Sequence, residues 1–150
     1  MHSDVQASYA HISGEMNGEM RNKLHYEIHG LTSPDAPTIV FSSGLGGAAK
    51  FWQPQLGDFA QDYRVITYDH YGTNKSVGDL PANYSISNMA DELAALLRKL
   101  EVQACHFVGH ALGGLVGLEL ALSKPKLLQS LVLVNAWSSP NPHTLRCFNI

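Results

Sequence analysis

The hydrophobic pattern of this chain alternates between short apolar runs and longer segments with helical spacing. Residues 38–41 are continuously apolar, which is typical of a strand covered on both faces of a sheet. Further strands are predicted at 64–69, 105–108 and 131–135. Residues 24–29 alternate between apolar and polar positions, which predicts a half-exposed strand.

Three segments between these strands have the pattern of helices. In residues 86–100 apolar side chains recur every three or four positions, and Ser85 or Ser87 could cap the start. Residues 51–56 predict a short amphipathic helix, with Pro54 near its first turn, and residues 111–122 predict a helix of about three turns that Pro125 would stop. Strands that alternate with helices predict an α/β fold, with a mostly parallel sheet, helices on both faces and one hairpin at an edge.

Composition narrows the class of protein. The 150 residues suit one domain, and 10 Lys and Arg against 13 Asp and Glu give no basic patch for nucleic acid. The longest apolar segment, 111–122, is too short to span a bilayer. Cys105 and Cys147 lie far apart without metal-ligand spacing, so reduced thiols in a cytoplasmic protein are expected. Residues 1–19 show no period and predict a flexible N-terminal extension, with Met20 as an alternative natural start.

Residues 105–114 carry the most informative motif. An apolar strand turns through Gly109-His110-Ala111-Leu112-Gly113 into an apolar helix, which is the layout of the G-x-S-x-G nucleophile elbow. Glycines suit the two flanking positions because bulky neighbours would collide with so tight a turn. Ala111 occupies the position of the serine, and we expect it to have a positive φ. The scaffold for nucleophilic catalysis is therefore predicted without its nucleophile.

The glycine loop 44–47 admits two interpretations. Residues 44–49 fit G-x-G-x-x-A, and Asp69 ends the next strand at the spacing of a residue that binds a ribose, which would make a dinucleotide site. Pro54 opposes this interpretation, because a pyrophosphate needs an unbroken helix starting inside the glycine turn. The other interpretation is the first half of an oxyanion hole, with backbone N–H groups of Leu45 and Leu112 as donors. We expect Asp69 to brace its own loop.

These motifs resemble the N-terminal half of an α/β-hydrolase, and within that superfamily the chain is similar to the RutD proteins of the pyrimidine-utilisation pathway. The resemblance covers about residues 20–150 and includes the alanine of the elbow. It is carried by segments spread along the chain, namely 41–47, 51–56, 69–76, 84–86 with Met89, 108–113, 134–137 and 143–148. The chain departs from the family at 30–37, at Lys75 and in length.

The resemblance implies a partial hydrolase domain, residues 20–150, that ends where a lid would begin. It implies hydrolysis of a small, labile product of uracil breakdown, a carbamate or aminoacrylate, without a cofactor or a metal. The triad acid and histidine would lie in later strands, so we expect this chain by itself to be inactive. The candidate site comprises Ala111 at the nucleophile position, the N–H groups of Leu45 and Leu112, and, for binding substrate, Gly44, Gly46 and His110.

Two other functions remain open. Ala111 is also compatible with a non-catalytic binding or interaction domain that has kept the hydrolase shape, and the dinucleotide-binding domain is the third alternative. We expect His110 to be packed and hydrogen-bonded rather than catalytic. The expected partner is a small molecule, with neither nucleic acid nor membrane, and a homodimer is left open.

Overall fold

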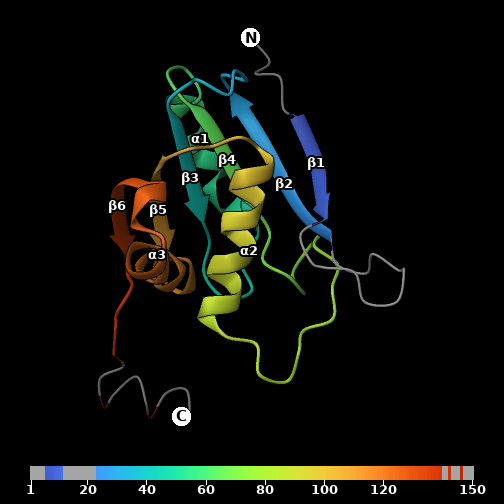
Figure 1. The fold of residues 1–150 in the computed structure, drawn as a ribbon, viewed down its shortest axis with the longest axis vertical. Helices are drawn as coiled ribbons and strands as arrows, with labels where there is room; N and C mark the ends of the chain where they lie inside the picture. Colours follow the sequence, from blue (N-terminus) through green and yellow to red (C-terminus); the bar gives the residue numbers. More distant parts are fainter. Residues whose placement is uncertain (1–5, 12–22, 140–141, 143–145, 147–150) are drawn as a thin grey trace.

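The sheet of this protein has six strands in the order β1-β2-β4-β3-β5-β6 (Figure 1). The structure is a computed structural model, and it describes residues 6–11, 23–139, 142 and 146. The strands are β1 (Gln6–His11), β2 (Lys23–Gly30), β3 (Thr38–Ser42), β4 (Arg64–Tyr68), β5 (Cys105–His110) and β6 (Leu128–Val134). Strands β4, β3, β5 and β6 are parallel, whereas β1 and β2 run antiparallel to their neighbours.

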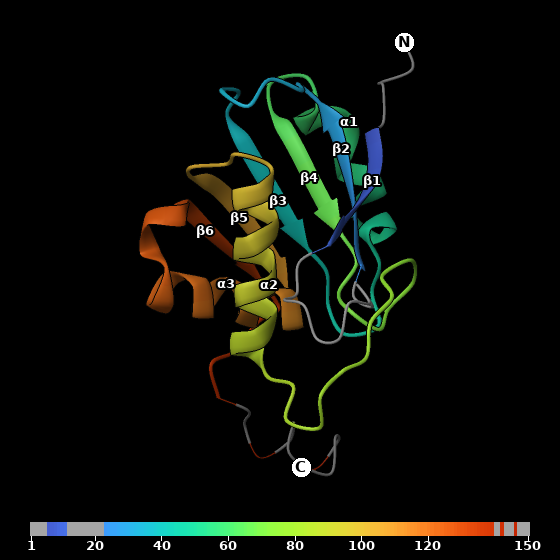
Figure 2. The ribbon, with the colours of Figure 1, turned by 45° about the vertical axis from the view of Figure 1, so that its right-hand side comes forward.

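The helices cover both faces of this sheet, as predicted. The helix α1 (Gln53–Phe59), preceded by the 3-10 turn η1 (Ala49–Trp52), lies on one face, and α2 (Ile86–Lys99) and α3 (Leu112–Ser123) lie on the other (Figures 1 and 2). Each face has its own apolar core. Trp52 and Leu56 pack with Phe41 on the α1 face, and Leu93 and Val116 belong to the larger core on the other face.

Local sequence determines where the helices begin and end. The Ser85 hydroxyl accepts from the Asn88 backbone N–H, and the Asn88 side chain accepts from the Ser85 N–H, which forms a capping box at the start of α2. Pro54 lies in the first turn of α1, where no intrahelical hydrogen bond is lost. Helix α3 ends at Ser123, and Pro125 starts the short 3-10 turn η2 (Pro125–Leu127).

Two sequence expectations at one side of the sheet are corrected. Residues 6–11, expected to belong to a flexible extension, form β1 and pair with β2. Strand β2, expected to be half-exposed, lies between β1 and β4, and Leu24, His25 and His29 on its two faces are all buried. A sequence pattern indicates only the polarity of a segment, and the polar His25 is buried here because the fold places its ring beside the carboxylates of Glu27 and Asp69.

The opposite side of the sheet ends at β6. This strand begins at Leu128, three residues before the predicted start, and pairs in parallel with β5 across an irregularity between Cys105 and His106. Val132, Leu133 and Val134 are between 37% and 49% exposed. Within the described residues β6 therefore forms an apolar edge of the sheet. None of the helices in the described ranges combines the length and the apolar composition that crossing a bilayer would need.

Candidate active site

The turn between β5 and α3 has the geometry that the sequence predicts for residue 111. Ala111 has φ 49° and ψ −114°, so the predicted positive φ is confirmed. Its carbonyl accepts from the N–H groups of Gly114 and Leu115, and its own N–H donates to Val134 at the end of β6. The backbone is thereby fixed on both sides of the turn, and the methyl group stands between strand and helix.

Close backbone packing explains the two glycines of this motif. A Cβ on Gly109 would lie 2.4 Å from the carbonyl oxygen of Gly113, and a Cβ on Gly113 would lie 2.3 Å from the carbonyl oxygen of Ser42. Neither contact could relax without moving backbone. The flanking glycines therefore let the start of α3 approach both its own strand and the end of β3.

The loop after β3 lies against the same turn. A Cβ on Gly44 would be 3.1 Å from His110 Nδ1 and 3.3 Å from the Ala111 Cβ, so the two glycine motifs are brought together. The Gly47 N–H donates to the Gly44 carbonyl, and Gly46 has φ 70°, which closes a tight turn. The N–H of Leu45 takes no part in this hydrogen bond. The N–H of Leu112 is among the first of α3, where a helix offers donors without intrahelical acceptors.

His110 is packed as expected but is not fully hydrogen-bonded. Its ring stacks on Phe51 with centroids 4.9 Å apart and an interplanar angle of 22°. Its buried Nδ1 has no hydrogen-bond partner within the described part of the chain. The expectation of a hydrogen-bonded histidine is therefore corrected at Nδ1, because the aromatic contact with Phe51 orients the ring without occupying that nitrogen.

A cavity of about 710 Å3 opens at the carboxyl ends of β3, β4 and β5. Three predicted site residues line it, namely Leu45, Gly46 and Leu112. Gly44, His110 and Ala111 are not among the lining residues. They immediately precede lining residues in the sequence, Gly44 before Leu45 and His110-Ala111 before Leu112. The rest of the lining comes from the loop after β4 and the start of α2, and comprises His70, Tyr71, Gly72, Thr73, Leu80, Tyr84, Ser85, Ile86 and Met89.

Sequence reasoning did not assign these further residues to the site. The signal that could have found them is positional, because ligands of parallel α/β sheets bind beyond the carboxyl ends of the strands. His70 lies two residues after the end of β4, so it belongs to that edge. Its Nε2 lies 3.0 Å from the Ser43 carbonyl and must donate to it, and burial lowers the pKa of the imidazole, which favours the neutral ring.

Asp69 organises the loop that carries this lining. Its buried carboxylate accepts from the backbone N–H of Ala49 at 2.7 Å and from the Asn74 side chain at 2.9 Å. It also accepts from the Lys75 N–H, and His25 Nδ1 lies 3.3 Å away. The expectation that Asp69 braces its loop is confirmed. The dinucleotide interpretation is wrong on this point, because a fully buried carboxylate engaged in these bonds cannot reach a ribose.

A glutamate stands behind the cavity wall. The Tyr84 hydroxyl donates a hydrogen bond to the Glu92 carboxyl on α2, and burial raises the pKa of this carboxyl to about 7. Nearby, Ser42 and the hydroxyl of Tyr68 are 2.7 Å apart, which ties β3 to β4 beneath the loop that precedes Leu45. Burial also raises the pKa of the Tyr68 hydroxyl, so this tyrosine stays neutral.

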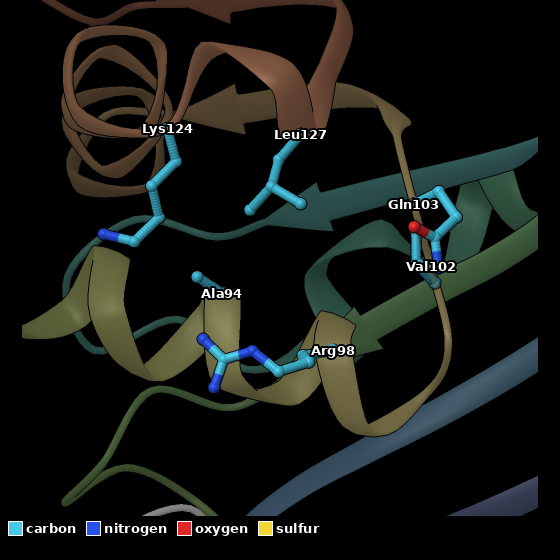
Figure 3. Close-up of a pocket in the computed structure, with 6 residues that line it drawn as sticks. All are labelled: Ala94, Arg98, Val102, Gln103, Lys124 and Leu127. Atoms are coloured by element: carbon cyan, nitrogen blue, oxygen red, sulfur yellow. The ribbon is translucent and has the colours of Figure 1, made fainter.

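A second cavity of about 310 Å3 lies at the end of α3 opposite Ala111 (Figure 3). Arg98 extends along it from α2 and Lys124 from the residue that follows α3, and Lys124 is paired with Asp91. None of the predicted site residues lines this cavity. The thiol of Cys105 is buried and free, and burial raises its pKa to about 12, so it is no nucleophile, while Cys147 lies outside the described residues.

The fold and the paired glycine turns define a hydrolase scaffold, and comparison with known proteins agrees. Residues 37–149 match the family of the alpha/beta hydrolase fold, so the chain belongs to that family. Among solved structures, it resembles a hydrolase from Pseudomonas aeruginosa with a TM-score of 0.79 and 28% identity, over 95% of this chain and 51% of that one. An enol-lactonase from Burkholderia xenovorans gives a TM-score of 0.76 and 30% identity, over 86% and 46% of the two chains.

More particularly, the chain is similar to RutD, a proposed carbamate hydrolase. It is 65% identical to RutD of Stutzerimonas stutzeri and 58% identical to RutD of Pseudomonas syringae, each over 127 residues or 85% of this chain. The resemblance expected from the motifs is therefore confirmed. The matched part is 48% and 49% of these relatives, so the chain spans about half their length.

Proposed function

We propose that this chain forms the oxyanion-hole half of a hydrolase that acts on a small, labile product of pyrimidine catabolism, a carbamate or an aminoacrylate. The observation that carries the proposal is the placement of Ala111. It occupies the strained position of a nucleophile elbow at φ 49°, directly against Gly44 of the facing loop. The similarity to RutD, which is a proposed carbamate hydrolase in those relatives, supports the substrate class.

The mechanism has to proceed without an acyl-enzyme, because a methyl group cannot attack a carbonyl. A water held near Ala111 would be the nucleophile, and the N–H groups of Leu45 and Leu112 would stabilise the negative charge that develops on the substrate oxygen. Gly46, which lines the cavity, would border the bound substrate, and Gly44 and His110 would support this part of the site from behind the lining. The base would come from later strands of a full hydrolase fold, so the 150-residue chain alone should be inactive.

The size of the catalytic effect limits the substrate. An oxyanion hole and binding retain roughly 10³–10⁴-fold acceleration over water when the triad is removed. That factor suffices for an enamine or carbamate that already decomposes in water, and it is too small for a stable amide or ester. The absence of a serine thus favours a labile substrate.

The decisive experiment restores the nucleophile. The matched segment of full-length Stutzerimonas stutzeri RutD is replaced with the corresponding residues of this chain, and Ala111→Ser is compared with the parent and with Ala111→Gly. The serine variant should release nitrophenolate from nitrophenyl acetate in a burst, because an acyl-enzyme accumulates. The parent and the glycine variant should show no burst, and the parent should accelerate carbamate decay by about 10³-fold.

Each result bears on a different part of the proposal. A burst from the parent would mean that another residue is the nucleophile. A folded serine variant without a burst, together with a parent that accelerates no labile substrate, would favour the binding-domain alternative, for which Ala111 is equally suitable.

A further inference from the structure

The cavity lined by Leu45, Tyr84, Met89 and Leu112 has no permanently charged side chain among its described lining residues. A lysine or arginine is the usual partner of a bound carboxylate or carbamate ion. The titratable side chain with a pKa nearest neutrality is His70, and burial favours its uncharged form. A small anion would therefore lose its hydration here without gaining a cation.

Four polar side chains of this lining, those of His70, Thr73, Tyr84 and Ser85, already have hydrogen-bond partners within the protein. His70 donates to the Ser43 carbonyl, and the Thr73 hydroxyl donates to the His70 carbonyl at 2.6 Å. The Tyr84 hydroxyl donates to Glu92, and the Ser85 hydroxyl donates to the Asn88 side chain at 2.7 Å. What these residues present to a ligand is mainly carbon, together with the apolar side chains of Leu80, Ile86 and Met89.

The cavity is also large for a bare carbamate ion. An ion of four heavy atoms fills on the order of 100 Å3, judged from the ~30 Å3 share of one water molecule. The cavity measures about 710 Å3, which lies in the range of sites that hold drug-sized organic molecules. A bare ion would leave most of this apolar wall in contact with water.

We infer that this wall binds an uncharged, apolar substituent, so that the ligand is a labile carbamate that carries such a substituent rather than the bare carbamate ion. The reactive carbonyl would lie toward Leu45 and Leu112, and the substituent would lie toward Leu80, Ile86 and Met89. This inference rests on the proposed function for the carbamate group, whereas the preference for an uncharged apolar group rests on the cavity alone.

A binding experiment on the full-length hybrid tests the inference without requiring catalysis. Methionine methyl groups are labelled with ¹³C, and the Met89 resonance is assigned by Met89→Leu. Benzyl carbamate, the neutral probe, should shift the Met89 methyl resonance saturably, whereas bicarbonate, the stand-in for the bare ion, should need at least about tenfold higher concentration. Equal or tighter binding of bicarbonate, or no shift with either probe, would overturn the inference.

Two matched variants locate the effect. Leu80→Lys places a cation in the cavity wall, and Leu122→Lys makes the same change on α3 outside the cavity, with both side chains exposed at 48% and 81%. Leu80→Lys should weaken benzyl carbamate by about tenfold and strengthen benzoate, because apolar contact is lost and a cation is gained. Leu122→Lys should leave both affinities unchanged, and an equal effect of the two variants would refute the assignment.

The test of this inference and the test of the proposed function can give different results. Saturable binding of benzyl carbamate by a protein that hydrolyses nothing would retain this inference and remove the hydrolase. Acceleration of bare carbamate decay by the full-length hybrid, with no binding of benzyl carbamate, would do the reverse.

Discussion

The backbone of Ala111 occupies a region of φ/ψ space that residues with a Cβ rarely enter. A conformation of this kind costs about 1–3 kcal/mol, and it persists only where the surrounding structure enforces it. The enforcing contacts are the bond from its N–H to Val134 and the two bonds that its carbonyl accepts from Gly114 and Leu115. The backbone strain is therefore present at the position where a nucleophile elbow carries its serine, although the side chain here is only the methyl group of Ala111.

Replacing Ala111 with glycine should relieve this strain. We expect Ala111→Gly to raise the free energy of unfolding by about 1 kcal/mol, since the relief exceeds the ~0.4–1 kcal/mol that glycine costs through the unfolded state. Urea unfolding followed by circular dichroism would measure it. Ala95→Gly, inside α2, is the matched control and should destabilise by about 0.5–1 kcal/mol. Equal losses at both sites would argue against strain at residue 111.

Asp69 is the second residue on which the site depends. Asp69→Asn should lower the free energy of unfolding by about 2–3 kcal/mol, because the amide replaces a charged acceptor of several N–H donors and turns one acceptor into a donor. Asp62→Asn, at an exposed position before β4, should change the stability little. Thermal unfolding of both variants decides the matter, and an unchanged melting temperature for Asp69→Asn would show that the loop is held by other contacts.

At the scale of elements, α2 links protonation to the cavity wall. The pKa of Glu92 is raised to about 7, above the ~4.3 of an unfolded glutamate, so between these values the folded state binds more protons than the unfolded state. Stability should therefore fall as the pH rises from about 4.5 to 7 and then level off. At 1.36 kcal/mol for each pKa unit, the loss stays below about 4 kcal/mol, because Glu92 is only partly buried and solvent screens its charge.

This dependence can be isolated by substitution. The difference in unfolding free energy between the parent and Glu92→Gln should change across pH 4.5–7, since the variant has no proton to lose. Tyr84→Phe should extend the change to higher pH, because the hydrogen bond from Tyr84 lowers the pKa of Glu92. Urea unfolding over this pH range measures both. A constant difference between parent and Glu92→Gln would contradict the raised pKa.

How far each element could be predicted depends on whether its signal is local. The N-cap, predicted at Ser85 or Ser87 and found at Ser85, the apolar stripe of α2 and the stop at Pro125 depend on neighbouring residues, and those predictions are confirmed. Strand β1 lacks a pattern of its own and was missed, because it exists through pairing with β2. The cavity-lining residues from His70 to Met89 were likewise not predicted as site residues, since they come together only when the chain folds and the loop after β4 meets the start of α2.

At the scale of the whole molecule, the apolar edge of β6 predicts association in solution. Val132 is 49% exposed, and edge strands with apolar side chains and unpaired backbone groups favour pairing with other chains. We expect the 150-residue chain to sediment as oligomers or aggregates, and Val132→Lys should shift it toward monomer. Val77→Lys, the same substitution at a 63% exposed valine outside β6, should not change the oligomeric state. A cooperatively folded monomeric parent with a stability near ~10 kcal/mol would contradict this prediction.

The order and type of most elements, the turn at Ala111 and the likeness to RutD could be predicted from the sequence, because these depend on residues close together in the chain. The tertiary structure was needed to show that Gly44 packs against His110 and Ala111, that Asp69 is engaged in hydrogen bonds inside its loop, and that none of the described residues lining the cavity is permanently charged. These properties depend on which distant residues occupy the space around each side chain. Burial and pairing are set by those neighbours, and a local pattern of apolar and polar residues does not specify them.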